Sequence, residues 1–175
     1  MQNFKKNLIT IITVVKNSAP TIEKSIKSVM NQNYDKIEHI IIDGKSNDGT
    51  IEILKKYKNK IDKIIIQNDK GIWDAMNKGV EIANGDIIGF LNADDYYNQN
   101  ALNLVNKYFV NNKIDFLFGS VKKYKLMYGY RPWKIKWSFG FYSSHSVGFF
   151  IKRVKHIEVG KYNLDYLSSD LDFFY

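Results

Sequence analysis

Cysteine is absent from this chain of 175 residues. A disulfide framework, a thiolate-ligated zinc or iron–sulfur centre and a thiol nucleophile are therefore excluded, and any chemistry must come from oxygen, nitrogen and backbone groups. Long apolar runs are missing as well. Stretches such as residues 8–15 are far shorter than the roughly 20 residues that a membrane-spanning helix needs.

Internal repeats, Gly/Ser linkers and low-complexity tracts are also lacking, while 45% of the residues are hydrophobic. This length and apolar content indicate one globular domain over residues 1–175 and exclude a disordered tail or a multidomain protein. Lys5-Lys6 before residues 8–15 resembles the start of a secretory signal, but no small-residue cleavage site follows. We therefore expect a cytoplasmic protein that can also contact the inner face of the cell membrane peripherally.

Positive charge is concentrated in the second part of the sequence. The chain has 26 Lys and Arg against 18 Asp and Glu, which gives a net charge of +8. Residues 1–100 contribute +1 of this excess and residues 101–175 contribute +7. A basic, aromatic-rich segment is typical of proteins that bind nucleic acid, an anionic membrane or a phosphorylated substrate, and composition leaves all three open.

Short β-branched runs alternate with helical patterns over residues 1–100. This alternation predicts an α/β protein with a Rossmann-like, mostly parallel sheet and helices on both faces. The predicted strands are residues 8–15, 37–42, 61–67 and 86–91. Helices are predicted after Pro20-Thr21, after Asp48-Gly49-Thr50 and over residues 73–83, and Asn84-Gly85 is expected to cap the last of them.

Beyond residue 95 the pattern becomes less regular. We predict a helix containing Leu102, Val105 and Phe109, a strand over residues 116–121, and a hairpin or long loop over residues 122–137, where lysines alternate with aromatic residues. Ser168-Ser169-Asp170 has the pattern of a helix N-cap, yet the sequence stops one turn later. We therefore expect a chain that is truncated at its C-terminus.

Acidic side chains follow two of the predicted strands. Asp43 ends the second strand and Asp94-Asp95 follow the fourth, so both are expected at the sheet edge where α/β proteins bind ligands. Oxygen ligands without cysteine or clustered histidine favour Mg²⁺ or Mn²⁺, which bridge diphosphate oxygens. The structural alternatives are a helix N-cap at Asp95 or Asn98, and turn chemistry for the segment after Asp43. We assign turn chemistry to residues 47–50 and ligand binding to Asp43.

Five segments then occur in order: residues 9–17, 25–32, 42–50, 69–79 and 85–95. Each is a weak signal alone, but five at matching spacing are strong. Together they closely resemble the family 2 inverting glycosyltransferases with the nucleotide-sugar-binding GT-A fold, in the branch that assembles bacterial polysaccharides. The resemblance covers nearly the whole chain. It implies a nucleotide-sugar-binding half over residues 1–100 and an incomplete acceptor-side half over residues 101–175.

The resemblance also implies roles for individual residues around the donor. The end of the first strand borders the base, Asp43 recognises the nucleotide, and the loop and helix after the third strand line the donor. The implied donor-binding residues are Val15, Asn17, Asp43, Asp69, Gly71, Asp74, Asn77, Asn92, Asp94 and His145. For His145 a packed, hydrogen-bonded histidine is an equal alternative, and Ser146 follows it where the family usually has glutamine.

The segment Asn92-Ala93-Asp94-Asp95 corresponds to the family's Asp-x-Asp metal motif, although its first residue is asparagine here. The resemblance therefore implies that Asp94 and Asp95 hold Mn²⁺ or Mg²⁺. It also implies a catalytic base in an acidic motif that opens a helix, for which Asp170 is the best match and Asp172 the second. An N-cap role for Asp170 is the alternative.

The implied reaction moves a sugar, with inversion, from a UDP- or GDP-linked nucleotide sugar to a glycan or polyprenyl-diphosphate-linked acceptor in cell-surface polysaccharide synthesis. The basic, aromatic-rich segment would then face that acceptor or an anionic membrane surface, and nucleic acid is not expected as a partner. Two other hypotheses stay open at this point. One is a module that binds nucleic acid through the basic, aromatic-rich segment, and the other is a truncated, non-catalytic remnant that binds only nucleotide.

Overall fold

The computed structural model describes residues 6–122, 126–127 and 146–165. The strands are β1 (Ile9–Val15), β2 (Ile37–Asp43), β3 (Lys63–Ile66), β4 (Ile87–Asn92), β5 (Phe116–Phe118), β6 (Val121–Lys122), β7 (Leu126–Met127) and β8 (Phe149–Lys152). The helices are α1 (Ile22–Met30), α2 (Thr50–Lys56), α3 (Ile72–Ile82), α4 (Ala101–Asn111), α5 (Arg153–Val159) and a 3₁₀ turn, η3 (Ser146–Gly148).

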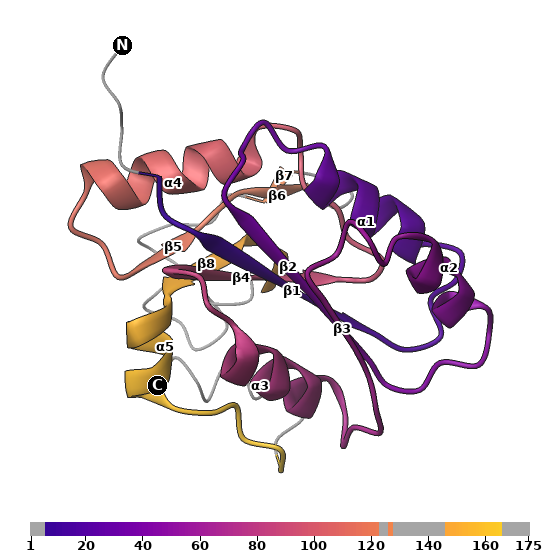
Figure 1. Ribbon diagram of the computed structural model, residues 1–175. Helices are drawn as coiled ribbons and strands as arrows, with labels where there is room; N and C mark the ends of the chain where they lie inside the picture. Colours follow the sequence, from indigo (N-terminus) through magenta and orange to yellow (C-terminus); the bar gives the residue numbers. More distant parts are fainter. Residues whose placement is uncertain (1–5, 123–125, 128–145, 166–175) are drawn as a thin grey trace.

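Six of the strands form one sheet in the order β3-β2-β1-β4-β8-β5. The first four strands of the chain run parallel to one another, and β8 runs antiparallel to both β4 and β5. Helices α1, α2 and α4 cover one face of the sheet, while α3 and α5 lie on the other (Figure 1). The predicted α/β class and mostly parallel sheet are confirmed.

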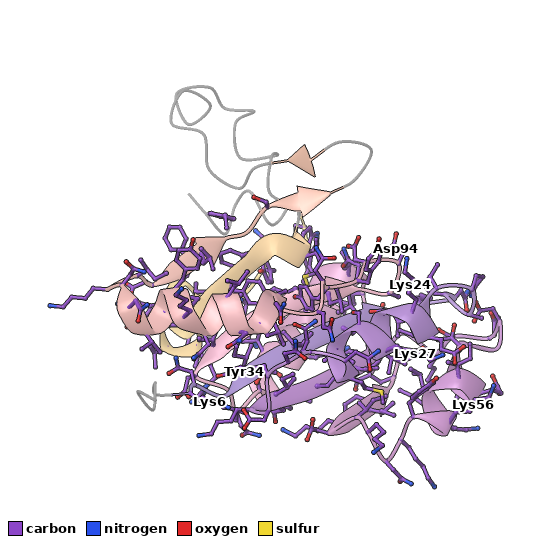
Figure 2. The ribbon with its side chains drawn as sticks, turned by 90° about the horizontal axis from the view of Figure 1, so that it is seen from above. Lys6, Lys24, Lys27, Tyr34, Lys56 and Asp94 are labelled. Atoms are coloured by element: carbon purple, nitrogen blue, oxygen red, sulfur yellow. The ribbon has the colours of Figure 1, made fainter. Side chains whose placement is uncertain are left out.

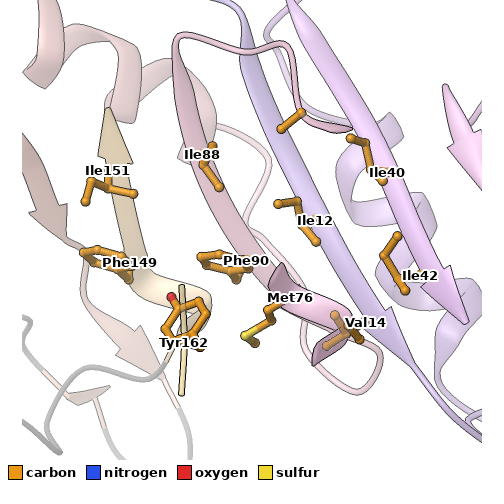
Figure 3. Packing of buried hydrophobic residues seen from close by; sticks show 12 residues of the cluster. Ile12, Val14, Ile40, Ile42, Met76, Ile88, Phe90, Phe149, Ile151 and Tyr162 are labelled. Atoms are coloured by element: carbon orange, nitrogen blue, oxygen red, sulfur yellow. The ribbon is translucent and has the colours of Figure 1, made fainter. Parts of the chain in front are cut away.

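The central strands are buried on both faces, as their β-branched sequences predicted. Side chains alternate between the two layers. Ile12 and Val14 of β1 pack with Met76 of α3 on one side (Figure 3), and Ile9 and Ile11 pack under α1 and α4 on the other. This alternation fixes the pairing register, because a slip by one residue would exchange the two sets of side chains.

Several elements differ from their sequence-based predictions. The third strand is shorter than residues 61–67, and the predicted strand 116–121 ends at Phe118, with Val121–Lys122 pairing separately. Strand β8 and helix α5 were not predicted, because their apolar and basic residues alternate too irregularly to show one period. Residues 168–175, on which the expectation of a truncated chain was based, lie outside the described residues.

The expected cap at Asn84-Gly85 was wrong. Helix α3 ends at Ile82, its C-cap is Ala83 in an extended conformation, and Gly85 does not have a positive φ. A side chain at Gly85 would instead come within 2.5 Å of Thr10 Oγ1 and 2.6 Å of the Thr10 nitrogen. Glycine is needed there because the backbone at position 85 lies too close to β1 to leave room for a side chain.

No described helix combines the length and the apolar composition that crossing a membrane requires.

A buried carboxylate joins β1, β2, β3 and the loop before β4, at the edge where β1 and β2 begin. Glu38 accepts hydrogen bonds from Thr10 Oγ1 (2.6 Å), Lys63 Nζ (2.8 Å) and the backbone nitrogen of Asn84 (2.7 Å). Burial would raise the pKa of Glu38, but these donors outweigh it and lower the pKa to about 2. Stability linked to Glu38 is therefore complete above the unfolded pKa of 4.5 and is lost as the pH falls toward 2.

Replacing Glu38 with glutamine should lower the free energy of unfolding at pH 7 by about 2 kcal/mol, because a charged acceptor is lost from a buried donor cluster. Urea unfolding measured from pH 7 to pH 3 checks this. The difference between the two proteins should shrink below pH 4.5, because Glu38 takes up a proton in the unfolded wild type while it stays ionised in the folded protein. A difference that stays constant with pH would contradict the assignment.

Two histidines are buried in neutral form. His39 of β2 contacts Thr13 Oγ1 through Nε2 at 2.9 Å, and its Nδ1 has no hydrogen-bond partner among the described residues. His156 of α5 packs against the rings of Phe90 and Tyr162. Burial lowers the pKa of each to about 4. The unfolded chain therefore binds protons that the folded chain excludes between pH 6.5 and 4.

We expect the wild-type free energy of unfolding to fall as the pH drops from 6.5 to 4. The His39→Gln variant keeps polar atoms near Thr13 but does not titrate. Its free energy of unfolding should therefore change less steeply with pH, by the slope that corresponds to about one bound proton. Chemical denaturation at half-unit pH steps measures both slopes. Identical slopes for the two proteins would show that His39 takes up a proton in the folded protein as readily as in the unfolded chain, which would contradict the assignment.

Candidate functional site at the carboxyl edge of the sheet

The ends of β1, β2 and β4 meet at one edge of the sheet. Val15 pairs with Asp43, and Val14 pairs with Asn92, so the predicted donor and metal segments flank the end of β1. With neighbouring strands about 4.8 Å apart, the backbones of β2 and β4 are about 10 Å from each other there. The sheet thus brings together carboxylate-bearing segments that are fifty residues apart in the sequence.

The carboxylate of Asp43 is fully buried and holds the loop that follows β2. It accepts hydrogen bonds from the Ser46 backbone nitrogen (2.8 Å) and from Ser46 Oγ (2.6 Å). Ser46 Oγ in turn accepts from the backbone nitrogen of Asn17, at 2.8 Å, and the Asn17 side chain accepts from the nitrogen of Asn47. Asp43 therefore ties the loop after β1 to the loop after β2. Its contact with a nucleotide stays a prediction.

The turn at residues 47–50 has the structural role expected of it. Asp48 accepts from Thr50 Oγ1 (2.6 Å), from the Thr50 nitrogen (3.0 Å) and from the Ala19 nitrogen (2.9 Å). These bonds lower the pKa of Asp48. Thr50 Oγ1 also accepts from the Ser18 nitrogen at 2.9 Å, so the loop after β1 is fixed at both of its ends.

Asp69 lies directly against the turn after β2. A Cβ atom on Gly44 would overlap Asp69 Oδ2, so glycine at position 44 leaves room for the carboxylate. The same glycine lies beside the aliphatic stem of Lys16, which puts a cation-bearing side chain near Asp69. Asp69 Oδ1 accepts from the Gly71 nitrogen at 3.1 Å, and Gly71 has φ +116° and ψ −179°, a conformation that glycine alone adopts readily.

Asp74 and Asn77 occupy the first two turns of α3 with different surroundings. Asp74 accepts from the Lys70 nitrogen at 2.9 Å and pairs with Lys78 at 2.8 Å, and both contacts lower its pKa, that of Lys78 most. Asn77 is buried, and its amide group bonds the oxygen and the nitrogen of Tyr162, each at 2.9 Å. Asn77 thus anchors the segment after α5, and its role in donor binding stays a prediction.

The carboxylates after β4 do not cap a helix. Helix α4 begins at Ala101 with Asn100 as its N-cap residue, and the nitrogen of Leu102 is bound by Gln32 Oε1 at 3.1 Å, so the structural alternative for Asp95 was wrong. Asp94 is exposed (Figure 2). Asp95 is half-buried, and its Oδ2 accepts from Asn92 Nδ2 at 3.2 Å. Two carboxylates and an amide therefore gather at the end of β4.

Two serines of α1 and a glutamine just after the helix support this turn, and they were given no role from the sequence. Ser25 Oγ donates to the oxygen of Asn92 at 3.4 Å, and Ser28 Oγ accepts from the nitrogen of Tyr97 at 3.1 Å. Gln32 Nε2 donates to the oxygen of Asn98 at 2.8 Å. The two serines at positions 25 and 28 lie on one face of the helix, and this spacing is the signal that could have revealed them.

A cavity of about 600 Å³ opens beside Asp95. Its walls come from the loop after β4, from α4, and from the β5 and β8 end of the sheet, and none of its described lining residues belongs to β1 or β2. A second cavity, of about 390 Å³, lies at the opposite edge of the sheet near Asn7, Asp86 and Arg153. His145, Asp170 and Asp172 lie outside the described residues.

Comparison with known proteins gives a family match over most of the chain. The model of the family described as "Glycosyl transferase family 2" matches residues 10–164. A putative teichuronic acid biosynthesis glycosyltransferase, TuaG, of Bacillus subtilis is 36% identical over 106 residues, which cover 58% of this chain and 41% of the relative. The Escherichia coli UDP-Glc:alpha-D-GlcNAc-diphosphoundecaprenol beta-1,3-glucosyltransferase WfaP is 40% identical over 93 residues, covering 51% and 36%. The match thus spans less than half the length of either relative.

The fold has solved counterparts. A mannosyltransferase of Pyrobaculum calidifontis, solved in complex with GDP-Man and Mn²⁺, superposes with a TM-score of 0.77 over 97% of this chain and 51% of the other, at 19% sequence identity. At that identity the similarity shows a shared fold.

Replacing Asn77 with alanine should lower the free energy of unfolding by about 1–3 kcal/mol, because the backbone nitrogen and oxygen of Tyr162 would lose their buried partners. Hydrogen exchange should speed up in the Tyr162 region, while β1 and β2 keep their protection as an internal control. Unchanged exchange at residues 160–164 would contradict the anchoring role.

Proposed function

The chain belongs to glycosyl transferase family 2, and we propose on this basis that it transfers a sugar, with inversion, from a nucleotide-diphosphate sugar to a glycan or lipid-linked acceptor in cell-surface polysaccharide synthesis. The observation that carries the proposal is the register that sets Asp43 and Asn92 on either side of the end of β1. Relatives named as a teichuronic acid biosynthesis glycosyltransferase and as a glucosyltransferase acting on a diphosphoundecaprenol-linked sugar support it over a nucleic-acid-binding module or a nucleotide-binding remnant.

In this proposal the nucleotide lies along the ends of β1 and β2. Val15 is buried, and Asn17 adopts a left-handed conformation (φ +50°) that its bonds to Ser46 and Asn47 hold in place. A base can rest against this fixed loop, with Asp69 and the Gly71 turn at its side. The donor is UDP- or GDP-linked, as the name of the Escherichia coli relative and the complex of the Pyrobaculum enzyme suggest.

The residues at the end of β4 fit a divalent cation. Mg²⁺ and Mn²⁺ sites on diphosphate substrates use one or two carboxylates together with phosphate oxygens and water. Asp94 and Asp95 supply that number, with Asn92 beside them, and a cage of three or more acidic or histidine side chains is absent from the described residues. A bound Mn²⁺ or Mg²⁺ would neutralise charge on the departing diphosphate. The hydrogen bond from Asn92 orients the Asp95 carboxylate toward this role.

The inverting reaction needs one base. The acceptor hydroxyl oxygen attacks the anomeric carbon, the bond from that carbon to the diphosphate oxygen breaks on the opposite side, and a carboxylate takes the hydroxyl proton. We assign the base to Asp170, with Asp172 second, and we place His145 near the donor or acceptor, all from the sequence. The net charge of +7 over residues 101–175 supports peripheral contact with an anionic membrane surface, which in this proposal is the inner face of the cell membrane, with the enzyme in the cytoplasm.

Asp95→Ala should weaken Mn²⁺-dependent binding of UDP or GDP at least tenfold, because one of two ligand carboxylates is lost. The free energy of unfolding should change by less than about 1 kcal/mol, since the side chain is half-buried and caps no helix. Isothermal titration with and without Mn²⁺ checks binding, and urea unfolding checks stability.

Asp35→Ala is the matched control, because Asp35 is an exposed carboxylate near the opposite edge of the sheet, paired with Lys6 at 2.7 Å. It should bind nucleotide as the wild type does. The proposal fails if Asp95→Ala retains full Mn²⁺-dependent binding, or if the wild-type protein binds neither nucleotide.

A further inference from the structure

The cavity beside Asp95 has walls of mixed aromatic, aliphatic and amide character. Its volume of about 600 Å³ falls in the range of about 300–1,000 Å³ that is typical of small-molecule sites. Its lining includes Asp95, Tyr96, Asn98, Leu104, Tyr108 and Ser120. Because Asp95 belongs to this wall, the cavity begins at the proposed metal site.

Helix α4 presents more apolar surface than its packing on the sheet uses. Leu102, Val105 and Phe109 are buried against the sheet and account for its attachment. Leu104 and Tyr108, one turn apart, line the cavity while their side chains remain 54% and 52% exposed. An apolar pair at the rim of a cavity contributes little to the core, and it suits a ligand with an apolar surface.

The cavity is held open by contacts made before any ligand arrives. Tyr97 is buried, its hydroxyl donates to the oxygen of Phe90 at 2.9 Å, and its ring stacks obliquely on Phe150 with centroids 5.8 Å apart. The ammonium of Lys24 lies 3.6 Å from the centre of the Tyr96 ring, a cation–π contact that ties the loop to α1. The two tyrosines next to Asp95 are therefore preorganised.

Charge limits what the cavity can hold. Among the described residues that line it, Asp95 carries the only charge, and none is Lys, Arg or His. An anionic group in this space would meet the Asp95 carboxylate, and the described cation beside the wall, Lys24, lies over the Tyr96 ring and is not among the lining residues. Asn98, Asn100 and Ser120 offer uncharged donors and acceptors instead, and tyrosine rings offer flat apolar faces.

We propose that this cavity binds the terminal, uncharged sugar of the acceptor. The inference rests on the proposed transferase function and names the acceptor class for it. The apolar face of a sugar ring packs against Tyr108 and Leu104, its hydroxyls bond Asn98, Asn100 or Ser120, and the sugar hydroxyl that reacts points toward Asp95. Any phosphate or diphosphate of the acceptor lies outside the cavity.

The test compares neutral and anionic probes on the intact chain. Saturation-transfer NMR is recorded with methyl glucoside, methyl galactoside and methyl N-acetylglucosaminide, and with methyl glucuronide and ribitol phosphate. At least one neutral glycoside should bind, and the anionic probes should bind at least fivefold more weakly. Stronger binding of the anionic probes would overturn the proposal.

Leu104→Lys places a cation in the cavity, and Ile157→Lys makes the same change at an equally exposed position, 57%, on α5 outside it. Leu104→Lys should weaken the neutral glycoside at least fivefold, and Ile157→Lys should leave it unchanged. Both variants should bind UDP or GDP with Mn²⁺ as the wild type does, which shows that each is folded. Equal glycoside binding by the two variants would overturn the cavity assignment.

The nucleotide measurement separates the two proposals. Nucleotide binding without binding of any neutral glycoside would overturn the cavity assignment and leave the transferase proposal standing. Glycoside binding that is sensitive to Leu104→Lys, in a protein that binds neither nucleotide, would overturn the transferase proposal and leave the cavity as a sugar site.

Discussion

The parallel pairing of β1 with both β2 and β4 is the constraint on which the candidate site depends. It places Val15 beside Asp43 and Val14 beside Asn92, so the polar turns after three strands open at the same edge. Apolar side chains cover both faces of these strands, and a shift of one residue would move a full set of isoleucines into the wrong layer. The packing of the core thereby fixes the geometry of the site.

At that edge, short polar side chains hold the loops in place through local hydrogen bonds. Asp43 and Ser46 join the turn after β2 to Asn17, and Asp48 with Thr50 fixes the other end of the same loop. Few long, flexible side chains take part, so little side-chain entropy is lost when the loops are ordered. A ligand-binding edge built in this way needs little rearrangement before it binds.

Helix α1 contributes to both halves of the site. Its apolar face packs on the sheet, and its Ser25 and Ser28 bind the segment that carries Asp94 and Asp95, while Gln32, just after its last turn, binds the first turn of α4. The same helix therefore positions the proposed metal ligands and one wall of the cavity beside them. This shared support links the proposed donor and acceptor sides through a rigid element.

The candidate site was predictable to the extent that it depends on strand ends. Asp43, Asp94 and Asp95 could be placed together from the sequence because the carboxyl ends of parallel strands meet at one edge. The support from Gln32 was not predictable, because it joins residues about seventy positions apart. Asn77 shows the same limit: the family resemblance implied a donor contact, which stays a prediction, but the bonds from its amide to the backbone of Tyr162, 85 residues away, could not be foreseen.

The amino-acid sequence by itself determined the α/β class, the approximate positions of the first four strands along the chain and the family, because periodicity and motif spacing are local properties of the chain. Only the tertiary structure decided that Gly85 serves close passage beside Thr10, that Asp95 caps no helix, and that a cavity lies against α4. Each of these depends on which side chains meet across the sheet, and such contacts are set by packing and not by any local pattern.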